Sequence, residues 1–114
     1  MKTTYSKNGG KRRNWTREET IAVVALYFQM ATLEQDKTPF KKAPLVREVM
    51  AETNRSKGSV EAKLMNVSGA IVALIASGDL DPEFPMVTGY APLGSFSKDL
   101  PTLLLECLGV AQCA

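Results

Sequence analysis

The stretch that decides the fold is Asn14-Trp15-Thr16-Arg17-Glu18-Glu19, which opens a strongly apolar run. Thr16 and Glu19 have the spacing of a capping box, in which each side chain accepts a hydrogen bond from the other residue's backbone N–H. The stretch therefore predicts a first helix from Arg17 to about Thr32. We expect Trp15, directly before the cap, to fold back onto the core.

The first helix carries more apolar side chains than one stripe needs. Four at helical spacing are expected to mark its main face: Ile21, Val24, Ala25 and Phe28. Four more add apolar surface beyond that stripe: Val23, Leu26, Tyr27 and Met30. We therefore expect a helix that is contacted on more than one side.

A second helix is predicted from Pro44 to about Thr53-Asn54. Proline suits a first helical position, because the N–H it lacks would have no partner there. Its buried face is expected to comprise Leu45, Val46, Val49 and Met50.

The third helix is the best patterned. Ser56 is a suitable cap, and Ser77-Gly78 a suitable end. Its inward stripe alternates four and three residues apart: Val60, Leu64, Val67, Ile71 and Leu74. Gly69 costs about 1 kcal/mol relative to Ala inside a helix, so it marks either close packing or the end of a shorter helix.

Beyond the third helix the chain changes character. Residues 79–96 contain prolines and glycines that break long elements, yet they are rich in apolar side chains, so we expect an ordered, packed loop. A short helix follows from Asp99 or Leu100 to Leu108. The predicted fold is all-α: a trihelical helix-turn-helix bundle (14–78) preceded by a flexible basic arm (1–13) and followed by the Pro/Gly-rich loop and short C-terminal helix (79–114).

The composition excludes several kinds of chemistry. The 114 residues suit one domain and include no His, which removes His-based catalysis and His–metal sites. No Gly-rich phosphate loop is present. The acidic cluster Asp79, Asp81 and Glu83 is expected to be a solvated turn and not a metal site. We therefore expect a protein that is not an enzyme and needs no cofactor.

The cellular location is predicted from the two cysteines, the N-terminal sequence and the length of the apolar runs. Cys107 and Cys113 match no zinc spacing and are expected to be reduced. No signal-peptide pattern and no bilayer-length apolar run is evident. We expect a cytoplasmic protein without a membrane partner, associated with the nucleoid if it binds DNA.

Positive charge is concentrated at the start of the chain, although the net charge is only +2. Lys11, Arg12 and Arg13 belong to a segment with no acidic residue before Glu18. Such a block is either an interaction arm or a solubilising tail.

The connection between the second and third helices predicts a nucleic-acid site. A turn as short as Asn54-Arg55-Ser56-Lys57 is typical of a helix-turn-helix, whose later helix enters the major groove. The outward set of that helix is then Lys57, Ser59, Glu61, Ala62, Lys63, Met65 and Asn66. We expect phosphate or base-edge contacts from Lys57, Ser59 and Lys63. Asn66 would pair with adenine, and Arg55 would bind a phosphate. The alternative is an ordinary solvated polar face.

The same residues carry a family resemblance. Residues 15–19 resemble the Trp-Ser/Thr-x-Glu-Glu opening of Myb/SANT-type (homeodomain-like) domains. Residues 13–100 also resemble the helical domain N-terminal to the nuclease in bacterial HNH restriction-type proteins, where an Arg-Thr/Ser-x-x-Ala/Ser-Val-x-x-Lys-Leu-x-Asn stretch opens the last helix. The matching positions are Arg55, Ser56, Val60, Lys63, Leu64 and Asn66. The chain departs from these families because it has one Trp and no nuclease part.

The resemblance implies a bacterial or phage DNA-binding module without the nuclease, with the arm residues Lys11, Arg12 and Arg13 on phosphates or in the minor groove. It also leaves structural roles open: Asn66 could hold a neighbouring loop, and the Lys63 stem could pack on the core.

The second hypothesis is a SANT-like protein-interaction module. Its docking face would be acidic: Glu18, Glu19, Glu48, Glu52 and Glu61. An exposed apolar patch of Met65, Phe84, Met86 and Tyr90 would support it.

Overall fold

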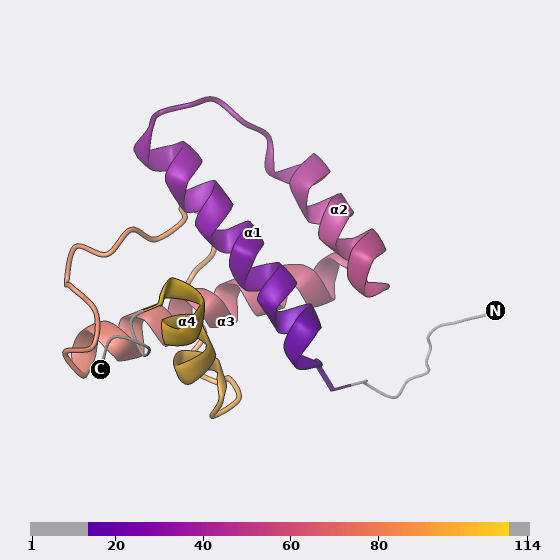
Figure 1. The fold of residues 1–114 in the computed structure, drawn as a ribbon. Helices are drawn as coiled ribbons and strands as arrows, with labels where there is room; N and C mark the ends of the chain where they lie inside the picture. The colour runs from indigo at the N-terminus through magenta and orange to yellow at the C-terminus, as the bar shows by residue number, and fades with distance from the viewer. Residues whose placement is uncertain (1–13, 110–114) are drawn as a thin grey trace.

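The computed structural model describes residues 14–109, and within them the protein is all-α. The helices are α1 (Arg17–Gln35), α2 (Lys42–Thr53), α3 (Lys57–Ala76) and α4 (Leu100–Leu108). Figure 1 shows α1 and α2 side by side in opposite directions, with α3 crossing them and α4 packed on α3 and α1. The all-α prediction and the short last helix are confirmed. The predicted arm (1–13) lies outside the described residues.

The capping box at the start of α1 is confirmed. The Thr16 N–H donates to Glu19 Oε1 at 3.0 Å, and the Glu19 N–H donates to Thr16 Oγ1 at 3.1 Å. α1 continues three residues beyond the predicted end, to Gln35, and Lys37 then takes a left-handed conformation with φ 57°.

The face of α1 that enters the core differs from the predicted stripe. The fully buried side chains are Val23, Val24, Tyr27 and Met30. Ile21 is 37% exposed and Ala25 is also exposed. The prediction was wrong at these two positions because α1 is apolar on two sides, and periodicity alone does not say which side meets α3.

The next two helices follow their sequence signals closely. α2 begins at Lys42, two residues before the predicted start, and ends at Thr53, where Asn54 adopts φ 56°. Pro44 still lies in the first turn, where backbone N–H groups have no helical partner. Ser56 caps α3, and all five residues of its predicted inward stripe are buried.

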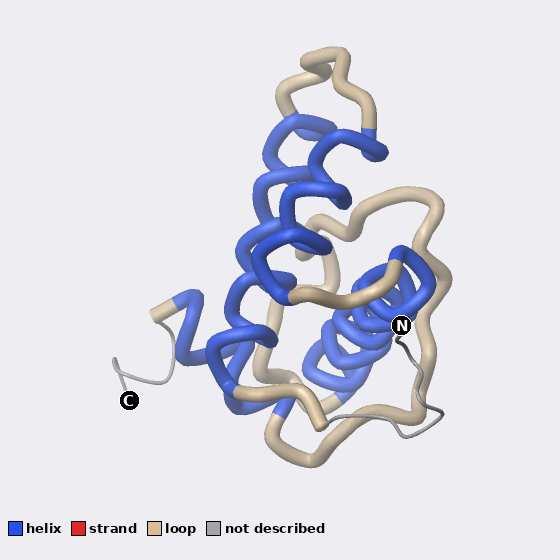
Figure 2. Tube along the Cα trace, turned by 90° about the vertical axis from the view of Figure 1, so that its right-hand side faces the viewer, coloured by secondary structure: helices blue, strands red, loops and turns tan. Residues whose placement is uncertain are grey.

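The connection from α3 to α4 is the ordered, packed loop that the sequence predicted. It curves around α3, the helix seen close to end-on in Figure 2. The Tyr27 hydroxyl lies 2.8 Å from Ser68 Oγ and accepts a hydrogen bond from the Val87 N–H at 3.1 Å. Burial raises the pKa of Tyr27. This buried network fastens the loop to both α1 and α3.

Gly69 is where the loop lies closest to α3. A Cβ at this position would lie 2.0 Å from the Leu93 carbonyl oxygen, and the Leu93 N–H donates to the Met65 carbonyl at 3.1 Å. Of the two sequence alternatives, close packing is therefore confirmed, although the neighbour is loop backbone and not another helix.

We expect Gly69→Ala and Gly58→Ala, two identical changes in α3, to act in opposite directions. The methyl group at Gly69 must displace backbone and should cost about 1–3 kcal/mol in unfolding free energy. Gly58 has nothing within 4 Å of its Cβ position, so Ala there should stabilise by up to about 1 kcal/mol. Urea unfolding measures both changes. Equal effects at the two positions would contradict the packing of Leu93 on α3.

Candidate nucleic-acid interface

Arg55 joins the α2–α3 turn to the start of α1. Its Nη2 lies 3.1 Å from Glu19 Oε1 and donates to the Asn14 carbonyl at 2.9 Å, and its guanidinium lies 4.0 Å from the centre of the Trp15 ring. The Arg55 and Glu19 side chains are only 9% and 13% exposed. The predicted phosphate ligand is thus engaged in an ion pair inside the protein.

Lys63 lies beneath Trp15. The residue is 8% exposed, and its Nζ lies 5.2 Å from the centre of the ring. Burial lowers the pKa of Lys63, and the positive charge of Arg55 lowers it further. The expectation of an outward Lys63 was wrong, because α3 is covered on more than the one side assumed. The structural alternative, a Lys63 stem packed on the core, is confirmed, as is the packing of Trp15.

Asn66 holds the loop that covers α3. Its Nδ2 donates to the Ser95 carbonyl at 2.9 Å, which is the structural role left open by the sequence. Because residues 93–95 lie against Met65, Asn66 and Gly69, this length of α3 is covered by the protein's own backbone.

The remaining DNA-binding candidates that the structure describes lie in the first turn of α3. Lys57 is exposed and Ser59 is half-buried. Lys11, Arg12 and Arg13 lie outside the described residues. The contact between Arg55 and Asn14 nevertheless fixes the residue that follows them at the α2–α3 turn.

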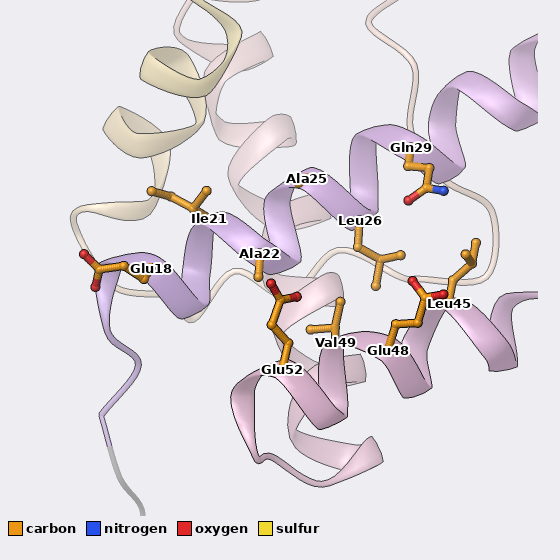
Figure 3. A pocket seen from close by; sticks show the side chains of 10 residues that line it. All are labelled: Glu18, Ile21, Ala22, Ala25, Leu26, Gln29, Leu45, Glu48, Val49 and Glu52. Carbon is orange, nitrogen blue, oxygen red and sulfur yellow. The ribbon is translucent and has the colours of Figure 1, made fainter.

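The five carboxylates proposed as a docking face do not gather on one surface. Glu19 pairs with Arg55. Glu18, Glu48 and Glu52 border an open groove of about 360 Å³ between α1 and α2, shown in Figure 3. The expected apolar patch is not exposed, since Tyr90 is buried and Met65, Phe84 and Met86 are half-buried against the core.

The acidic loop cluster behaves as the predicted solvated turn. Asp79, Asp81 and Glu83 are exposed; Asp79 accepts a hydrogen bond from Ser77 Oγ and Asp81 from the Glu83 N–H. Across residues 14–109, no three His, Cys, Asp or Glu side chains are grouped so as to hold a metal ion.

Within residues 14–109, one helix, α3, is long and apolar enough to cross a bilayer by length and composition alone, whereas the sequence analysis expected no apolar run of that length. Half of its most apolar window is buried inside the protein, as is also found for the core helices of soluble proteins.

In comparisons with known proteins, no protein-family model, no curated protein and no solved structure matches this chain.

Neighbouring glutamates in the first turn of α1 provide a test of the Arg55 ion pair. Glu19→Gln keeps an acceptor for the cap but leaves the buried Arg55 charge without its carboxylate, which should cost about 3 kcal/mol in unfolding free energy. Glu18→Gln removes an exposed carboxylate and should cost less than about 1 kcal/mol. Chemical denaturation of both variants measures the difference. Similar losses would show that Arg55 does not depend on Glu19.

Lys63→Met should leave the stability at about pH 7 unchanged or higher, since it removes a buried charge while keeping an unbranched stem against Trp15. The folded-state pKa of Lys63 lies below its usual 10.5. The folded protein therefore loses this proton before the unfolded chain does, and Lys63 destabilises less as pH rises toward 10.5. The stability difference between variant and parent should narrow in denaturant titrations as the pH rises from about 7 toward 10.5. A difference independent of pH would contradict the burial of a charged Lys63.

Proposed function

We propose that the protein is a non-catalytic double-stranded DNA-binding module that contacts phosphates at the N-terminal end of α3. The observation that carries this proposal is the hydrogen bond from Arg55 to the Asn14 carbonyl. This bond holds Asn14, the residue that follows the basic segment, at the turn between α2 and α3. The sequence resemblance to Myb/SANT-type domains and to the domain beside HNH nucleases gives further support. With it we propose a bacterial or phage origin and a nucleoid-associated role.

In our proposal, the phosphate-binding charges lie at the N-terminal end of α3. Lys57 is exposed in the first turn of α3, where the helix dipole and free N–H groups favour phosphate. Three residues of backbone span at most about 11 Å, so our proposal has Lys11, Arg12 and Arg13 contact phosphates within that reach of Asn14.

The contacts of two candidate residues limit which side chains could reach the bases of bound DNA. Lys63 and Asn66, the candidates deepest along α3, make intramolecular contacts. Contacts from Lys57, Ser59 and the basic segment would go mainly to phosphates, which set position and affinity but carry little sequence information. We therefore propose binding with weak sequence preference.

Salt titration tests this mode. Four phosphate contacts predict a slope of about −3.6 for log K against log salt on duplex DNA. Replacing Lys11, Arg12 and Arg13 together by Ala should weaken binding to all sequences and flatten the slope to about −0.9. Lys57→Ala should change the slope by about one unit. Fluorescence anisotropy at several salt concentrations measures each slope.

Lys41→Ala is the matched control, because Lys41 is exposed at the opposite end of α2 from the turn. It should leave affinity and slope unchanged. The proposal fails if the parent does not bind duplex DNA at low salt, or if Lys41→Ala reduces binding as much as Lys57→Ala does.

A further inference from the structure

The groove between α1 and α2 is a second surface, distinct from the first turn of α3. Its apolar lining comes from both helices: Ile21, Ala22, Ala25, Leu26, Leu45 and Val49. Figure 3 shows Ala22, Leu26, Leu45 and Val49 between the two helices, while Ile21 and Ala25 line the groove from the upper side of α1 in this view. Because α1 turns Val23, Val24 and Tyr27 into the core, the groove is lined by the other apolar side of the same helix.

Carboxylates border this apolar floor, and among residues 14–109 no Lys or Arg lines it. Glu18 lies on α1, and Glu48 and Glu52 extend from α2 toward α1 in Figure 3. A chain with a net charge of +2 thus presents a local concentration of negative charge around an apolar groove.

Glu48 and Glu52 occupy positions in α2 where a negative charge lowers helix stability. Glu48 and Glu52 are four residues apart, a spacing at which like charges repel. Glu52 also lies in the last turn of α2, which contains no basic residue and where the helix dipole favours cations. Local choices that oppose stability in this way are expected at functional sites.

We propose that this groove binds an amphipathic, basic helix of a partner protein, with apolar side chains on the floor and Lys or Arg paired with Glu18, Glu48 and Glu52. A groove between two antiparallel helices suits a third helix, which inserts residues spaced three and four apart. The charge complementarity selects a cationic partner over an acidic one. In this proposal, the protein-interaction surface lies on α1 and α2.

The test uses a fluorescent synthetic helix of about 18 residues, with Leu at i, i+3, i+4 and i+7 and Lys beside that face. We expect the full chain to bind this probe at low salt, and not a version with Glu in place of Lys. Glu48→Gln with Glu52→Gln should weaken binding about five- to tenfold, since it removes two ion pairs. Ile21→Ser should weaken it about tenfold by removing apolar contact.

Matched controls separate the groove from general effects of charge and apolarity. Glu83→Gln removes an exposed carboxylate in the loop, and Val72→Ser changes an apolar side chain of α3 that is 44% exposed. Both should bind the probe as the parent does. The paired glutamate substitutions lie at exposed positions, and an unchanged thermal midpoint would show that they remain folded.

Three results would overturn the proposal. The first is probe binding that is unaffected by the paired glutamate substitutions. The second is displacement of the probe by a synthetic peptide of residues 1–13, which would assign the groove to the chain's own N-terminus. The third is a dimer in sedimentation that dissociates with the same substitutions, which would assign it to a second copy of the chain.

Discussion

The buried contact of Arg55 with Glu19 and Trp15 is the interaction on which the rest of the structure depends. It joins the cap of α1 to the turn between α2 and α3. Glu19 Oε1 accepts hydrogen bonds from both the Thr16 backbone N–H and Arg55. One carboxylate therefore caps α1 and also holds the turn between α2 and α3 against it. Trp15 completes the contact by covering Arg55 and Lys63.

This contact explains why the charged side chains of Arg55 and Lys63, at and after the α2–α3 turn, are mostly unavailable to a ligand. Removing one member of a buried ion pair is costly, because the other charge remains in a poorly solvated site. Arg55 is therefore held in place by the fold. The loop that covers α3 also keeps this helix from a ligand. The Leu93 backbone packs against Gly69, and Asn66 donates a hydrogen bond to the Ser95 carbonyl. Among the described DNA-binding candidates, Lys57 and Ser59 in the first turn of α3 lie outside both constraints.

Sequence reasoning predicted the parts of the fold that depend on local chemistry. The capping box, the Ser56 cap and the stripe from Val60 to Leu74 each depend on residues close in the chain, and all are confirmed. It failed where a side chain's environment is set by distant segments. Lys63 has the spacing of an outward residue, but Trp15, 48 positions earlier in the chain, covers it.

The same distinction between local chemistry and distant contacts applies to the candidate sites. The groove between α1 and α2 had a sequence signal, since α1 is apolar on two sides while a core contact needs only one. What the sequence did not show is which side remains open, because this depends on how α3 crosses α1. Of the five carboxylates predicted to form one docking face, only Glu18, Glu48 and Glu52 line this groove.

The two proposed surfaces share one end of the molecule, which makes their charges interdependent. Glu18 and Glu19 are adjacent, yet Glu18 lines the groove and Glu19 faces Arg55 at the turn. Charges this close interact within a screening length of about 8–10 Å. A cationic helix beside Glu18 and Glu52 would neutralise carboxylates that repel the phosphates proposed to bind at Lys57. Such coupling is reciprocal, so bound DNA would strengthen the groove's hold on a basic partner to the same degree.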